Sequence, residues 1–205
     1  MPEGDAVRRL AGTLDELFVG GIVSASSPQG RFASSAALLD GWVMQRVRVH
    51  GKHMFIGFVP PTPGETYEAG VSLLEGAAAG SGEPILPEDA PWPDRWVHIH
   101  LGLYGWWRFN GDETVVDEGH GVAHRIPNVA KGEWNGHSET RWGEGFGEAK
   151  AGEWEPPEPV GAVRLRLFND HAVADLVGPN RCDLITDEER INAEAKLGPD
   201  PLDAG

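Results

Sequence analysis

Residues 42–58, WVMQRVRVHGKHMFIGF, contain two runs of strand-forming residues on either side of a short polar turn. In the first run valines alternate with arginines, and the second run is almost wholly apolar. Alternation with a period of two and a high content of Val, Ile and Phe are typical of β-strands. Gly51, in the tripeptide His50-Gly51-Lys52, suits a tight turn. The segment therefore predicts two strands joined by a hairpin-like turn.

The flanking segments extend this pattern. Residues 97–109 read as a strand, a glycine-rich turn and a second strand, and residues 164–168 alternate between charged and apolar side chains. Upstream, apolar residues at helical spacing predict a helix over residues 5–17, capped by Asp5 and ended by a Gly-Gly pair. With 28 glycines and 16 prolines, a helical bundle is excluded. We therefore expect a mainly β fold, a β-sandwich with one N-terminal helix.

The charge of the chain is strongly negative, at −15, but it is unevenly distributed. Residues 59–96 carry seven acidic residues and one arginine, and residues 110–160 carry eleven acidic and four basic residues. Both segments are rich in Gly and Pro and lack periodicity, so we predict two acidic, loop-rich insertions, with short strands around Val115 and Trp142. The remaining core is about neutral. Acidity therefore does not exclude a nucleic-acid partner, although it counts against tight binding.

Composition also limits the class of protein. A single cysteine excludes a disulfide framework and a cysteine-based zinc site within this chain. No apolar stretch approaches the roughly 18 residues of a membrane span, and the first residues do not resemble a signal peptide. We expect a cytoplasmic protein with no membrane partner.

The N-terminus offers a nucleophile. Removal of Met1 would leave Pro2 with a free secondary amine, which can attack an aldehyde-level carbon and form an iminium ion. Glu3 lies beside it and could act as a general acid or base. The same two residues are also common at helix starts for reasons of capping alone.

Three further groups are candidates for binding. Lys52 could present its ammonium to a phosphate from the turn, although most lysines are simply exposed. His98 and His100 share one face of a strand and could be structural or line a substrate site, and a third metal ligand is not evident. Leu103 and Tyr104, between two glycines, could form a wedge between bases or merely a tight turn.

Taken together and in order, these motifs resemble those of the formamidopyrimidine-DNA glycosylase/endonuclease VIII family. The matching stretches are Pro2-Glu3-Gly4-Asp5, His50-Gly51-Lys52-His53 and the run from His98 to Gly105. The first is most similar to the endonuclease VIII branch. Near the end, residues 196–202, KLGPDPL, resemble the entry to that family's helix-two-turn-helix DNA-binding domain.

The resemblance implies a bifunctional DNA glycosylase and AP lyase of base excision repair, acting on damaged duplex DNA. Pro2 would form a Schiff base with the sugar, Glu3 would move protons, and Lys52 would contact the phosphate beside the lesion. Leu103 and Tyr104 would fill the gap left by the flipped nucleotide. Arg181 is a candidate contact to the DNA backbone, although it matches no family motif.

The resemblance also implies a domain organisation. Residues 1–186 would form the catalytic β-sandwich, including the insertions 59–96 and 110–160, and residues 187–205 would begin a truncated helix-two-turn-helix domain. The family's zinc finger would lie outside this chain, so we expect no metal or other cofactor here. A monomer associated with the bacterial nucleoid is expected, and the acidic insertions could serve a protein partner.

Two other functions remain open. The chain could be an inactive family member that binds damaged DNA or protein, which the net charge of −15 would favour. An N-terminal-proline tautomerase would also need a free Pro2, but it would need neither Lys52 nor the motif at residues 196–202.

Seven cationic side chains of the core could bind phosphates of a DNA backbone. They are Arg46, Arg48, Lys52, Arg108, Arg164, Arg166 and Arg181.

Overall fold

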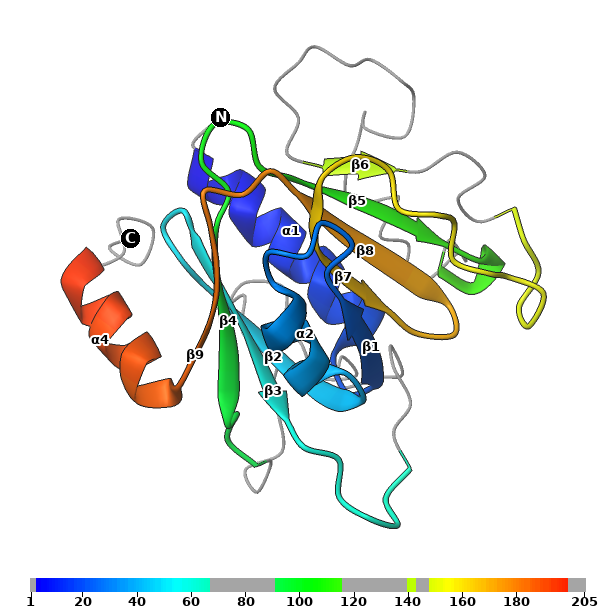
Figure 1. The fold of residues 1–205 in the computed structure, drawn as a ribbon, viewed down its shortest axis with the longest axis horizontal. Coiled ribbons are helices and arrows are strands. Elements are labelled where there is room, and N and C mark those ends of the chain that lie inside the picture. The colour runs from blue at the N-terminus through cyan, green and yellow to red at the C-terminus, as the bar shows by residue number, and fades with distance from the viewer. Residues whose placement is uncertain (1–2, 67–90, 116–139, 143–147, 199–205) are drawn as a thin grey trace.

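The computed structural model describes residues 3–66, 91–115, 140–142 and 148–198 (Figure 1). Its elements in chain order are α1 (Glu3–Phe18), β1 (Ile22–Ser26), α2 (Ala33–Leu39), β2 (Trp42–His50), β3 (His53–Val59), β4 (Arg95–His100), β5 (Trp106–Gly111), the 3₁₀ turn η1 (Glu113–Val115), β6 (Thr140–Trp142), β7 (Val163–Phe168), β8 (Ala172–Val177), β9 (Arg181–Ile185) and α4 (Asp187–Leu197).

Within the described residues the strands form one continuous sheet in the order β6-β5-β8-β7-β1-β2-β3-β4-β9. All neighbouring pairs are antiparallel except β5 and β6. Strand β1 belongs to both halves, because it pairs with β2 through Ile22 and Val23 and with β7 through residues 24–26. The mainly β fold with an N-terminal helix is confirmed, and so are the strands predicted within residues 42–58.

The core lies between the two halves of the sheet. Leu10, Leu14 and Phe18 of α1 are fully buried and share one cluster with apolar residues of both halves, among them Ile56 of β3 and Phe109 of β5. The predicted apolar stripe of α1 is therefore confirmed. The predicted cap was wrong, because α1 begins at Glu3 and Asp5 lies inside its first turn. After Phe18 the chain leaves the helix through Gly20, whose φ is 89° and whose N–H donates to the Met44 carbonyl.

Several elements were not predicted. Helix α2 has seven residues of which only Ala36 and Leu39 are buried, too few to give an apolar period. Strands β1, β8 and β9 are short, and β9 carries charged residues. Around Val115 the chain forms a 3₁₀ turn instead of the predicted strand, whereas the strand predicted around Trp142 is present as β6. Most of both acidic insertions lies outside the described residues.

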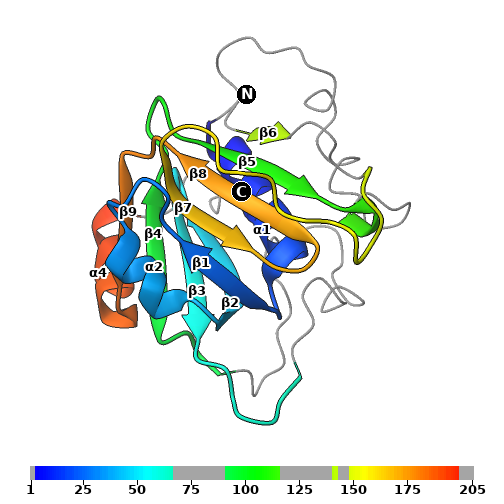
Figure 2. The ribbon, with the colours of Figure 1, turned by 45° about the vertical axis from the view of Figure 1, so that its right-hand side comes forward.

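Helix α4 is anchored to the sheet by a buried arginine. The helix begins with a capping box, in which Thr186 and Glu189 exchange side-chain and backbone hydrogen bonds. The Arg190 guanidinium lies 4.8 Å from the ring centre of Trp96 and pairs with Asp187 at 2.7 Å and Glu194 at 2.6 Å. The contact with Trp96 joins α4 to β4, whereas the pairs with Asp187 and Glu194 lie within the helix and hold the guanidinium in place. Helix α4 lies across the outer side of β4 and β9 (Figures 1 and 2). A domain boundary at residue 187 stays a prediction.

Every helix among the described residues is too short or too polar to cross a lipid bilayer.

Candidate functional site

Three connections between strands emerge at the same end of the sandwich. His53, at the start of β3, pairs with His100 at the end of β4, and His100 pairs with Arg181 at the start of β9. Trp106 at the start of β5 pairs with Val177 at the end of β8. The β2–β3 turn, the β4–β5 loop and the β8–β9 loop are therefore neighbours. The first turn of α1 lies at this end as well (Figures 1 and 2).

The sequence-predicted site residues that the structure describes lie at this end of the molecule. Lys52 is exposed in the β2–β3 turn, and Arg181 is the first residue of β9. Leu103 and Tyr104 are 85% and 80% exposed, the largest values among the exposed large apolar residues of the described chain. Glu3 is the first residue of α1, and Pro2 lies outside the described residues. Their assigned roles stay predictions.

The exposure of Leu103 and Tyr104 follows from the way their loop is held. The Gly105 N–H donates to the Leu101 carbonyl at 3.0 Å, which closes a tight turn and leaves the two side chains outside it. Gly102 has a φ of 68°, and a Cβ there would lie 2.4 Å from the Asn180 side chain. The β4–β5 loop therefore packs directly against the β8–β9 loop, next to Arg181.

Replacing Gly102 by alanine is expected to displace this loop. The added methyl group meets Asn180, and a positive φ costs an alanine about 1 kcal/mol in addition. Gly30→Ala is the matched control, because Gly30 has a φ of 89° but open space around its Cβ position. Thermal unfolding should show a larger loss of stability for Gly102→Ala than for Gly30→Ala. Equal losses would mean that the two loops do not constrain each other.

A cluster of histidines lies beside Lys52 and Arg181. His53 Nδ1 and His98 Nε2 are 2.8 Å apart, and the His53 ring also lies 4.6 Å from that of His100. Both His98 and His100 contact His53, so the prediction that they share a face is confirmed. His98 further contacts Arg181, at 3.5 Å between Nδ1 and Nη1. The sequence assigned no role to His53, because its contact with His98 depends on strand pairing.

The imidazoles of this cluster are neutral at pH 7. Burial is the largest effect on His53 and His98 and lowers the pKa of each to about 4, with neighbouring positive charges acting in the same direction. The pKa of His100 is also lowered, first by burial and then by Lys52 and Arg181. Lys52 and Arg181, rather than the imidazoles, therefore carry positive charge next to this cluster. Within the described residues no group of three or more His, Cys, Asp or Glu side chains is arranged to hold a metal ion.

This pKa shift makes stability depend on pH. An imidazole with a pKa near 4 in the folded chain and about 6.5 in the unfolded chain stabilises the fold above pH 6.5, and this stabilisation is lost as the pH falls towards 4. The drop in melting temperature from pH 7 to pH 5 should be larger for the wild type than for His98→Gln. Asp15, whose pKa burial raises to about 6, acts in the opposite direction but is common to both proteins. Identical pH profiles would contradict the neutral state of His98.

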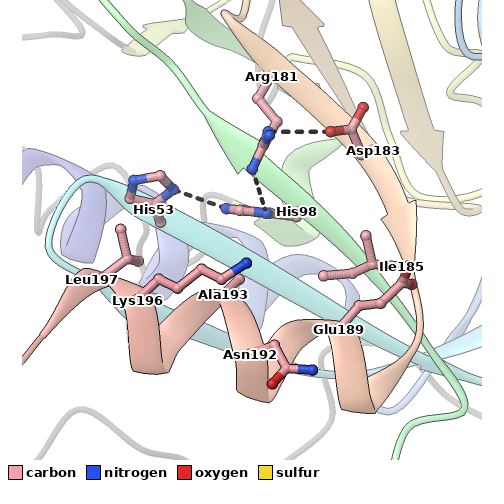
Figure 3. A pocket seen from close by; sticks show the side chains of 10 residues that line it. All are labelled: His53, His98, Arg181, Asp183, Ile185, Glu189, Asn192, Ala193, Lys196 and Leu197. Atoms are coloured by element: carbon pink, nitrogen blue, oxygen red, sulfur yellow. Dashed lines mark hydrogen bonds and ion pairs between the residues drawn. The ribbon is translucent and has the colours of Figure 1, made fainter.

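A pocket of about 590 Å³ lies between α4 and strands β3, β4 and β9, with His53 and His98 in its wall (Figure 3). Its lining residues are His53, His98, Arg181, Asp183, Ile185, Glu189, Asn192, Ala193, Lys196 and Leu197. The C-terminal end of α4 is tied to the β2–β3 hairpin, because His50 Nε2 lies 2.7 Å from the Gly198 carbonyl oxygen.

Several of the seven cations that could bind phosphate make contacts within the protein, as Arg181 does with His98 and Asp183. Arg46 lies over the Trp92 ring at 4.4 Å, and Arg48 pairs with Glu194 at 3.5 Å. Arg164 donates to Gln29 at 2.7 Å. Arg166 is buried, pairs with Asp175 at 3.5 Å and donates to the Pro157 carbonyl. Lys52 and Arg181 are the two candidates that the structure brings to the loop end.

Comparisons with known proteins identify curated proteins that are similar to this chain. No protein-family model matches the chain. Curated proteins called endonuclease 8 1, from Mycobacterium bovis and Mycobacterium tuberculosis, are 32% identical over 202 residues, which is 98% of this chain and 49% of theirs. The chain thus spans about half the length of the curated relatives it matches.

Solved structures similar to this chain include Lactococcus lactis Fpg in complex with DNA that contains an abasic site. That match has a TM-score of 0.48 and 12% identity over 96% of this chain and 47% of the other. MutM in complex with DNA containing carbocyclic 8-oxo-G gives a TM-score of 0.48 and 13% identity over 95% of this chain and 48% of the other.

Proposed function

The chain belongs to the formamidopyrimidine-DNA glycosylase/endonuclease VIII family, and on this basis we propose that it is the N-terminal catalytic domain of a bifunctional DNA glycosylase and AP lyase. Its substrate would be duplex DNA with an oxidised base, as in base excision repair. The observation that carries the proposal is the convergence at one end of the sandwich. There the start of α1, which follows directly on Pro2, lies at the same end as Lys52, Arg181 and the exposed pair Leu103 and Tyr104.

In the proposed reaction the secondary amine of Pro2 is the nucleophile. Once Met1 is removed, the Pro2 nitrogen attacks C1′ of the damaged nucleotide, and the base departs with the electrons of the glycosidic bond. The nitrogen loses its proton and the C1′–O4′ bond breaks, with O4′ taking up a proton as the sugar ring opens, so that the nitrogen and C1′ share an iminium double bond. This bond is an electron sink, so that loss of a proton from C2′ expels the 3′-phosphate and nicks the strand.

Glu3 and Lys52 support this chemistry. Glu3 protonates the opening sugar or the departing base and moves protons in the later steps. Lys52 holds the phosphate beside the lesion, and its exposed position in the β2–β3 turn suits a contact to the DNA backbone. The imidazoles of His53 and His98 are neutral at pH 7, so they add no charge to that of Lys52 and Arg181.

Leu103 and Tyr104 account for access to the damaged nucleotide. Flipping a nucleotide out of the duplex costs a few kcal/mol of stacking and pairing, and an apolar side chain inserted into the gap offsets part of that cost. The two side chains are exposed on a loop that is braced by Asn180, so they meet the DNA without first leaving a core.

Borohydride trapping on a duplex with an abasic site tests the proposal. Reduction of the iminium should give a covalent adduct of the 205-residue chain, and mass spectrometry should place the adduct on the N-terminal peptide. Binding of the abasic duplex without an adduct would favour the second candidate, a family member that binds damaged DNA but lacks activity. The net charge of −15 is the observation that favours this alternative.

A further inference from the structure

His98 links two of the proposed DNA contacts. Its side chain is 3% exposed and stacks on Phe55 with the ring centres 4.4 Å apart. One ring nitrogen contacts His53, the residue after Lys52 in the β2–β3 hairpin, and the other contacts Arg181. Figure 3 shows this chain of side chains running from β9 over β4 to β3.

The chemistry of arginine fixes the direction of these hydrogen bonds. A guanidinium has only donors, so Arg181 Nη1 donates and His98 Nδ1 accepts. Neutral His98 therefore carries its proton on Nε2 and donates it to His53 Nδ1, 2.8 Å away. By the same logic His53 carries its proton on Nε2, the ring nitrogen that faces away from His98 (Figure 3).

Arg181, at the other end of this series of side chains, is also held in place. Arg181 Nε pairs with Asp183 Oδ2 at 3.1 Å, so the guanidinium contacts a carboxylate on one side and an imidazole on the other. Asp183 and His98 are register partners on β9 and β4. Because His98 is buried and lies on a paired strand, the sheet fixes its position.

We propose that His98 is a positioning residue that holds Arg181 and the Lys52–His53 hairpin at a fixed spacing for two backbone phosphates of the bound DNA. The proposal rests on the proposed function. His98 itself does not touch the DNA. It acts by accepting from Arg181 and donating to His53, so that both groups are oriented before DNA arrives and their side chains lose less entropy on binding.

The tautomers can be tested without DNA. Long-range nitrogen-15 NMR spectra of the histidines in the 205-residue chain at pH 7 should show His53 and His98 neutral and protonated on Nε2. In His98→Leu the His53 ring should lose its single tautomer, whereas His98→Gln, which can both accept and donate, should keep it. A proton on His98 Nδ1 overturns the proposal, whether or not the protein binds DNA.

The second test measures affinity for a duplex with a stable abasic-site analogue as a function of salt. His98→Leu should bind about tenfold more weakly, and its slope of log K against log salt should be shallower by about 0.9, the value of one lost phosphate contact. Borohydride trapping at saturating DNA should keep its rate. Adding His98→Leu to Arg181→Ala should weaken binding further, through the Lys52–His53 hairpin, but by less than His98→Leu weakens binding of the otherwise wild-type chain.

Controls separate positioning from damage to the fold. His98→Gln should restore affinity to within about twofold, since it can replace both hydrogen bonds. His171→Leu removes a histidine that bonds Asp112 at 2.8 Å on the β7–β8 turn, at the opposite end, and should leave DNA affinity unchanged. Additive losses for His98 and Arg181, or an unchanged salt slope in His98→Leu, overturn the proposal. If the wild type does not bind the duplex, the proposed function fails and this role fails with it.

Discussion

An N-terminal extension that cannot be cleaved is expected to abolish borohydride trapping, down to the background without enzyme. The extension converts the nitrogen of Pro2 into an amide, whose lone pair is delocalised into the carbonyl and is no longer nucleophilic. The measurement is the yield of covalent adduct with an abasic duplex, before and after the extension is removed by a protease that leaves Pro2 at the terminus. Removal should restore the adduct.

Two variants make this result specific. Pro2→Gly leaves a primary amine at the same place and should retain part of the trapping. Lys52→Gln removes the amine in the β2–β3 turn at this end of the sandwich and should reduce DNA binding while an adduct still forms. Full trapping by the extended protein, together with loss of trapping in Lys52→Gln, would move the nucleophile from Pro2 to Lys52.

The sequence predicted those parts of the fold that local patterns encode. Residues 42–58 form β2 and β3 because the first run alternates and the second is almost wholly apolar, which suits the continuous burial of β3 from Met54 to Val59. The apolar stripe of α1 packs into the core, as its helical spacing requires. Strand β8 was missed, because Asp175 interrupts its apolar run. That carboxyl is buried and lies 3.5 Å from Arg166 on the neighbouring strand, a pairing that only the register reveals.

In the candidate site, too, some residues could be found from local patterns and others only from strand pairing. Lys52, Leu103 and Tyr104 could be singled out from motifs in short stretches of chain. The position of Arg181 at the same end depends on how β4 pairs with β9, and the contact between His53 and His98 joins residues 45 positions apart. Such contacts follow from topology, so no local pattern could have indicated that His98 lies between two predicted DNA contacts.

Glu3→Gln is expected to slow removal of an oxidised base by about 10²- to 10⁴-fold, the usual contribution of a positioned proton donor. Cleavage at a preformed abasic site should slow much less, because its sugar has already lost the base and the step that most needs a proton is past. Single-turnover rates on the two duplexes, at saturating protein, measure the difference directly. Equal losses on both substrates would contradict this role of Glu3.

Asp5→Asn is the matched control for this experiment. Asp5 and Glu3 both lie in the first turn of α1, and each substitution replaces a carboxylate by the amide of the same shape. Both variants remove one negative charge near the DNA, so both should strengthen binding at low salt to a similar, small extent. A loss of base removal in Glu3→Gln alone would therefore reflect proton transfer, whereas parallel losses in the two variants would reflect the helix terminus and its charge.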